Sequence, residues 1–192
     1  MRPRREPNRN NEYAYFVSTQ TFDRKPFFRH DRWARLMIAT LDHYAKSDFL
    51  LHAYVVLPDH LHLLITPSVS VEKSAQLIKG GFSFRGKREL DWKGEIWQPG
   101  FTDHRIRDEE DWNHHIEYIQ KNPVHAHLVE DSVLYPYMSF PDTQFPRGLK
   151  PAYSGDVDVR AEARTLQAMI GESRLAQEPQ DPVKGTGFSL PK

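Results

Sequence analysis

The 192-residue sequence contains no cysteine. This excludes disulfides and thiolate zinc sites, so any metal must be bound by histidine, carboxylate or amide side chains. The sequence also has no apolar run long enough to span a bilayer, and its charged start, residues 1–11, lacks the apolar stretch of a secretory signal. We therefore expect a cytoplasmic protein with no membrane partner.

The sequence has no net charge, which argues against a general coat protein for nucleic acids. The charges are nevertheless unevenly distributed. Residues 1–46 hold twice as many basic as acidic side chains, and residues 73–88 are basic with no acid at all. Such segments can follow a phosphate backbone, but they can equally be solvated surfaces.

The length indicates one domain with an appendage, and a hydrophobic content of 39% is enough for a core. We expect a flexible basic arm over residues 1–12 and a folded domain over 13–140. Proline and glycine recur after residue 140, which predicts an extension over 141–192 with one amphipathic helix at 158–175 and a disordered end.

Hydrophobic periodicity predicts the elements of the folded domain. Strands are expected at 13–21, 50–57, 60–66, 101–106 and, as a short edge, 135–140. Helices are expected at 31–45, at 71–87 with a weak point or bend at Gly80-Gly81, and at 108–122, ended by Pro123. This order predicts an α+β, ferredoxin-like split β-α-β sandwich: an antiparallel sheet with helices on one face, plus a late helix.

The segment His-Leu-His at residues 60–62 follows a Pro-Asp turn within the predicted hairpin. Because side chains alternate along a strand, His60 and His62 share one face, and the leucine row lies on the other. Two imidazoles in this arrangement can bind one divalent ion. Taken alone, the tripeptide is more often a pair of half-exposed histidines.

The predicted late helix carries a buried stripe of Trp112, Ile116 and Ile119. His115, Tyr118 and Asn122 lie along one margin of this stripe, and Tyr118 and Asn122 are stacked because they are four residues apart. From this margin they could reach a neighbouring strand, although a boundary aromatic and a polar residue at the helix end would give the same pattern.

Three segments in order resemble the REP-associated tyrosine transposases, which belong to the single-tyrosine HUH transposases of insertion-sequence type. They are HLH at 60–62, GEIWQPGFTDHRIR at 94–107 and IEYIQKNPV at 116–124. The likeness extends over about residues 13–140. It favours the metal site and implies that residues 13–140 form a catalytic domain.

The resemblance implies that Tyr118 is the catalytic nucleophile and that His60, His62 and Asn122 bind Mg²⁺ or Mn²⁺. The implied reaction is metal-dependent cleavage and rejoining of single-stranded DNA through a 5′-phosphotyrosine intermediate, which needs no nucleotide cofactor. A free tyrosine has a pKa near 10, so deprotonation needs assistance. The ion, or His114 or His115, could provide it.

The implied partner is single-stranded or hairpin DNA at repetitive extragenic palindromes, bound by a monomer or homodimer. Basic side chains interleaved with aromatic rings suit single strands, because bases stack while phosphates follow the charges. The candidate DNA-binding residues are Arg2, Arg4, Arg5, Arg9, Lys79, Arg85, Lys87, Arg88, Trp92 and Arg105.

Two other activities remain open. The protein could be a metal-dependent phosphodiesterase that uses water as nucleophile, or a hairpin-binding protein without catalysis. A histidine-triad nucleotide hydrolase is excluded, because the third position of that motif is Leu64.

Overall fold

The computed structural model describes residues 12–45, 47–140 and 145. The arm predicted for residues 1–12 and the extension predicted for 141–192, with its helix at 158–175, lie almost wholly outside these residues and remain predictions. No helix in the described ranges combines the length and hydropathy needed to cross a bilayer.

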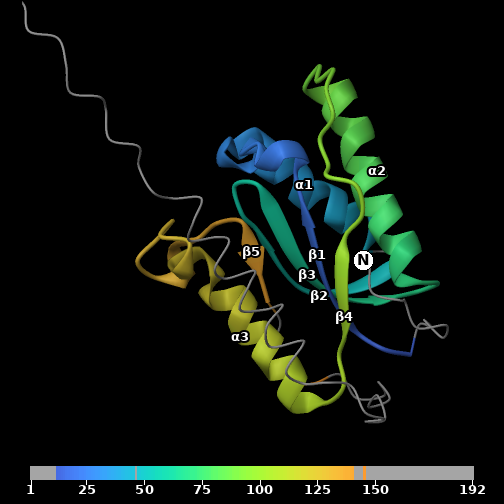
Figure 1. Cartoon of the computed structure of the whole chain (residues 1–192), viewed down its shortest axis with the longest axis vertical. Helices are drawn as coiled ribbons and strands as arrows, with labels where there is room; N and C mark the ends of the chain where they lie inside the picture. Colours follow the sequence, from blue (N-terminus) through green and yellow to red (C-terminus); the bar gives the residue numbers. More distant parts are fainter. Residues whose placement is uncertain (1–11, 46, 141–144, 146–192) are drawn as a thin grey trace, which may run out of the picture. The chain divides into compact units, whose positions relative to one another are not determined.

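The chain forms a five-stranded antiparallel sheet in the order β4-β1-β3-β2-β5 (Figure 1). The strands are β1 (Tyr15–Gln20), β2 (Phe49–Val56), β3 (His60–Pro67), β4 (Thr102–Arg105) and β5 (Met138–Ser139). The first four strands have the split β-α-β order, and β5 adds the edge predicted near 135–140. The predicted α+β sandwich is confirmed.

Three helices cover the sheet: α1 (Asp31–Tyr44), α2 (Val71–Glu89) and α3 (Glu109–His125). The first two pack together on one face, as expected, whereas α3 packs against β2 and β3 from the other side (Figure 1). Short 3-10 helices occur at Phe22–Arg24, Phe27–Arg29 and Ser132–Leu134.

Alternation along the strands divides the buried residues between the two faces of the sheet. The core beneath α1 and α2 contains Tyr15 and Val17 of β1 and the apolar side chains on one face of β3. These side chains pack against aromatic and aliphatic side chains of the two helices. The members of this core include Leu61, Leu63, Ile65, Trp33, Met37, Ile78 and Phe82. The opposite face of β3 is thereby left to α3.

The GEIWQPG segment continues the sheet beyond β1. Phe22 donates its backbone N–H to Ile96, and Gln98 donates to Gln20, with N···O distances of 2.9 and 3.0 Å. The ring of Trp97 packs against Phe82 with centroids 5.4 Å apart. This part of the motif therefore has a structural role beneath α2.

The prediction that Pro123 ends α3 is wrong, since the helix continues to His125. Proline removes only its own N–H donor, and the next turn still closes because Ala126 donates to the carbonyl of Asn122 over 2.9 Å. Pro123 is also buried, so packing offsets the lost hydrogen bond. As a result Asn122 is held inside a regular turn.

The glycine pair does not interrupt α2, and its two members differ in their surroundings. A Cβ atom at Gly80 would have no neighbour within 4 Å, whereas one at Gly81 would lie 2.5 Å from the ring of Tyr44. Gly81 therefore permits the close packing of α2 on the end of α1.

These surroundings predict opposite effects of two adjacent substitutions. Gly80→Ala should stabilise the protein by about 1 kcal/mol, because alanine has the higher helix propensity. Gly81→Ala should lose this gain, since Tyr44 must move to accommodate the methyl group. Urea unfolding of both variants measures the difference, and equal stabilisation would contradict the packing role of Gly81.

Candidate active site

The site is built on β3, the central strand of the sheet, which pairs with β1 on one side and β2 on the other. His62 lies opposite Ser18 of β1 and is 2% exposed, while His60, opposite Gln20, is half-buried near the end of the strand. Both imidazoles lie on the face predicted for them. Their ring centroids are 5.0 Å apart and the planes are nearly perpendicular, at 80°.

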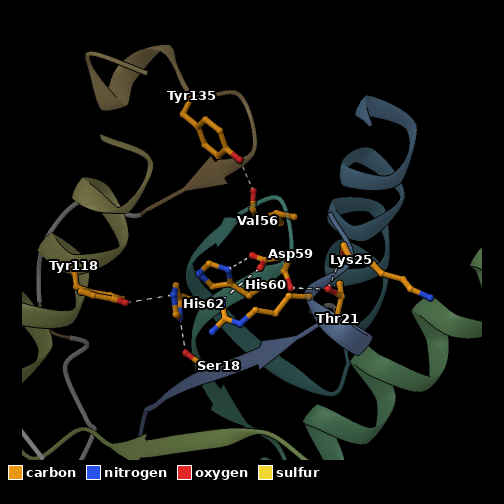
Figure 2. A network of polar contacts seen from close by, with 10 residues as sticks. Ser18, Thr21, Lys25, Val56, Asp59, His60, His62, Tyr118 and Tyr135 are labelled. Carbon is orange, nitrogen blue, oxygen red and sulfur yellow. Dashed lines mark hydrogen bonds and ion pairs between the residues drawn. The ribbon is translucent and has the colours of Figure 1, made fainter. Parts of the chain in front are cut away.

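In both imidazoles the Nδ1 atom already has a hydrogen-bonding partner. Nδ1 of His62 forms a short hydrogen bond with the hydroxyl of Ser18. Nδ1 of His60 lies 2.6 Å from the carboxylate of Asp59 (Figure 2). The Nε2 atoms are therefore the ones available to a further ligand.

Tyr118 reaches the same place from α3. Its hydroxyl lies 3.5 Å from Nε2 of His62, on the side of the ring away from Ser18 (Figure 2). The phenol thus lies beside His62, and both groups belong to one chain. The catalytic role of Tyr118 stays a prediction.

Phe16 of β1 holds these rings in place. Its ring stacks on His62 with centroids 5.3 Å apart, and Tyr118 approaches it edge-on at 5.6 Å. Phe16 is 3% exposed, so water has little access to this side of the two rings.

Asn122 lies one helical turn after Tyr118, and both side chains are buried. Burial raises the pKa of Tyr118, and the Asn122 side chain opposes this shift only in part. The phenol is therefore protonated at neutral pH in the protein alone.

Burial also lowers the pKa of His62 well below its usual value, and the neighbouring His60 and His115 act in the same direction. Neutral imidazole is the form that binds metals. Ser18 and Asp59 occupy only the Nδ1 atoms, and α3 carries an amide oxygen at Asn122, so the residues present fit a divalent cation that also retains oxygen ligands.

A second polar cluster lies where β4 meets α3. His104, Asp111 and His115 each place a ligand atom within 4.8 Å of the others, so this buried group could bind a metal. Arg107 would compete with a metal for the Asp111 carboxylate, because its backbone N–H and its guanidinium both donate to that carboxylate, over 2.9 and 3.2 Å. The carboxylate thus already ties the start of α3 to the end of β4.

The two proton-transfer candidates lie in different environments. His114 is exposed, whereas His115 is buried and donates from Nδ1 to the carbonyl of Asp111, 2.7 Å away. Nε2 of His115 has no hydrogen-bonding partner among the described residues. The role of either in proton transfer remains a prediction.

Several DNA-binding candidates have structural partners. Lys79 donates to the carbonyls of Gln98 and Gly100, and Arg85 pairs with Glu89 at 2.8 Å. Trp92 meets Phe27 edge-on at 4.9 Å against the core, and the guanidinium of Arg105 lies 4.9 Å from the ring centroid of Tyr13. Lys87 and Arg88 are exposed. Arg2, Arg4, Arg5 and Arg9 lie outside the described residues.

Three residues of the site were missed by the sequence reasoning: Phe16, Ser18 and Asp59. The alternation of β1 could have placed Phe16 and Ser18 on one face, because Tyr15 and Val17 face the helices. It could not have shown which strand lies beside them. Asp59 was interpreted only as a turn residue.

The fold and the site can now be compared with known proteins. The family model described as IS200-like transposase matches residues 11–122, more than half of the sequence. The chain therefore belongs to the IS200-like transposase family.

Within that family it resembles the REP-associated tyrosine transposases. It is 35% identical over 111 residues to such a protein of Escherichia coli (strain K12), a match that covers 57% of this chain and 65% of that one. A relative from Haemophilus influenzae is 34% identical over 113 residues, covering 53% of this chain and 62% of its own. The chain thus matches less than two thirds of the length of these relatives.

A solved structure of a REP-associated tyrosine transposase bound to a REP hairpin has the same fold. It superposes with a TM-score of 0.62 at 26% identity, covering 82% of this chain and 94% of that chain.

The contacts of Asp111 predict a pH-dependent contribution to stability. Burial opposes its ionisation, but hydrogen bonds from His104, His115 and Arg107 outweigh this effect and hold its pKa well below the usual range. Because the pKa is lowered on folding, the stabilisation is complete above the unfolded value near 4 and is lost as the pH falls further. Asp111→Asn should cost about 2–3 kcal/mol at pH 7, and the deficit should narrow below pH 4.

Urea unfolding at pH 7 and pH 3 measures this deficit. The matched control is Glu110→Gln, an exposed neighbour in the same first turn, which should change stability little. A deficit of equal size in the two variants would show that the cluster contributes no specific stabilisation.

Proposed function

We propose that the protein is a metal-dependent transesterase that cleaves and rejoins single-stranded DNA beside hairpin elements. The observation that carries the proposal is the approach of the Tyr118 hydroxyl to Nε2 of His62, 3.5 Å away, in a chain of the IS200-like transposase family. A tyrosine hydroxyl beside an imidazole that can bind a cation suits metal-assisted phosphoryl transfer to tyrosine.

In the proposed reaction Tyr118 Oη attacks the scissile phosphorus, and the bond from phosphorus to the 3′ oxygen breaks. The net proton transfer is from the phenol to the 3′ oxygen, which leaves as a hydroxyl, so the reaction consumes and releases no proton overall. The 5′ phosphate remains esterified to Tyr118, which conserves the energy of the phosphodiester for rejoining by the reverse attack.

His60, His62 and Asn122 would bind the cation, Mg²⁺ or Mn²⁺, which when bound supplies Lewis-acid polarisation of the phosphate. The chain itself orients the nucleophile: Phe16 packs against the ring of Tyr118, and the hydroxyl lies 3.5 Å from Nε2 of His62. Since burial raises the pKa of this phenol, the nucleophile is protonated at neutral pH and must lose its proton during the attack.

The histidines and the tyrosine come from one chain, so a monomer would suffice to cut one strand. A single tyrosine makes one covalent link at a time, so a complete strand exchange would need a second protein molecule or a second round. Both the monomer and the homodimer remain compatible with this scheme.

Hairpin DNA is the proposed partner, because a solved relative is a REP-associated tyrosine transposase bound to a REP hairpin. The exposed Lys87 and Arg88 at the end of α2 are the described candidates with the greatest access to phosphate. The arginines of residues 1–11 are a further proposed contact.

The nucleophile can be tested with a labelled single-stranded hairpin oligonucleotide, Mn²⁺ and a denaturing gel. The unmodified protein should form a covalent protein–DNA adduct, and Tyr118→Phe should reduce the adduct by at least about a thousandfold, because the attacking oxygen is removed. EDTA should abolish the adduct and added Mn²⁺ should restore it.

The matched control is Tyr135→Phe, which removes a half-buried hydroxyl that donates to the carbonyl of Val56 over 2.7 Å, away from the imidazoles. This variant should form the adduct normally. Cleavage that persists in Tyr118→Phe would indicate a phosphodiesterase that uses water. Binding without any cleavage by the unmodified protein would indicate a hairpin-binding protein.

A further inference from the structure

The turn between β2 and β3 places a carboxylate directly behind one of the imidazoles. Oδ1 of Asp59 lies 2.6 Å from Nδ1 of His60, and the two side chains are 18% and 16% exposed (Figure 2). On the other side of the carboxylate, Oδ2 lies 3.5 Å from the guanidinium of Arg24. The carboxylate of Asp59 thus lies between the guanidinium of Arg24 and the ring of His60.

This contact determines where the hydrogen of His60 resides, whereas the contact of His62 does not. An ionised carboxylate can only accept a hydrogen bond, so Nδ1 of His60 must carry the hydrogen and the lone pair of the neutral ring is on Nε2. The hydroxyl of Ser18 can donate or accept, so it leaves the tautomer of His62 open. The two histidines are therefore controlled differently.

Asp59 is itself fixed by the segment that follows β1. Its carbonyl accepts the backbone N–H of Thr21 over 2.8 Å, and the hydroxyl of Thr21 lies 2.9 Å from the same oxygen. The turn is further tied by Phe28, which donates to the carbonyl of Pro58 over 2.9 Å. These contacts restrict the backbone of Asp59, and its side chain is directed by the contacts with His60 and Arg24.

The backbone that delivers Arg24 is strained. Asp23 and Arg24 have φ angles of 51° and 49°, a left-handed conformation that costs residues other than glycine of order 1 kcal/mol each. Two consecutive residues of this kind persist only where surrounding contacts hold them, and here they bring the guanidinium to Asp59.

From these contacts we propose that Asp59 is a positioning residue that holds His60 as the Nδ1–H tautomer and directs Nε2 toward the bound cation. The proposal rests on the metal site of the proposed function. It assigns to Asp59 the part that carboxylates play behind metal-binding histidines in general, where they fix the tautomer and the ring orientation and raise ligand basicity.

The test compares Asp59→Asn with Asp42→Asn, an exposed position on α1 that undergoes the same loss of charge. In the metal-free protein, ¹⁵N–¹H correlation spectra report the tautomer of His60, with its signals assigned from His60→Gln. The unmodified protein and Asp42→Asn should show the Nδ1–H form. Asp59→Asn should show a mixture, since an amide can donate as well as accept.

The second measurement is the affinity for Mn²⁺ alone, determined by isothermal titration calorimetry. Asp59→Asn should weaken Mn²⁺ binding by about 10–100-fold, and Asp42→Asn should leave it unchanged. A pure Nδ1–H form together with unchanged Mn²⁺ affinity in Asp59→Asn would overturn the proposal. If Asp59→Asn fails to fold, Asp59→Glu, which keeps the acceptor, should fold and retain the Nδ1–H form; a mixed tautomer there would also overturn it.

The two proposals fail separately. If the unmodified protein forms no DNA adduct but the His60 tautomer still depends on Asp59, the transesterase is wrong and the role of Asp59 stands. If the unmodified protein forms the adduct but the His60 tautomer does not depend on Asp59, the transesterase stands and the role of Asp59 is wrong.

Discussion

The positions of both the hydrophobic core and the candidate site depend on the pairing of β3 with β1 on one side and β2 on the other. A strand that is hydrogen-bonded on both sides cannot rotate, so its alternate residues are committed to opposite faces of the sheet. In β3 this commits Leu61 and Leu63 to the core beneath α1 and α2, and it commits His62 to the face covered by α3. A shift of one residue would turn the imidazoles into the core and the leucines toward α3, so the hydrophobic core and the site favour the same register.

The fold could largely be predicted from the sequence, because its signals are local. The strong apolar runs on either side of Pro58-Asp59 identify the hairpin, and the spacing of Trp112, Ile116 and Ile119 identifies the buried side of α3. The error at Pro123 has a local origin too. The rule that helices end before proline takes account of the steric restriction on the preceding residue but not of the packing of a buried ring in the last turn.

The candidate site was predictable only in part. His60, His62 and Tyr118 belong to short motifs, whereas the contacts that support them join residues far apart in the sequence. Ser18 meets His62 across 44 positions, and Arg24 meets Asp59 across 35. Strand alternation restricts which face such residues occupy, but strand order decides which of them become neighbours, and one sequence without a structure does not determine that order.

Phe16 separates two groups of imidazoles. One side of its ring stacks on His62, and its contact with His115, with centroids 4.6 Å apart, joins it to the cluster around Asp111. A benzene ring has neither a lone pair nor an N–H, so it cannot relay a hydrogen ion between them. No proton can therefore pass through position 16 between the β4–α3 junction and the imidazoles of β3, although the two groups remain coupled by charge, since His115 lowers the pKa of His62.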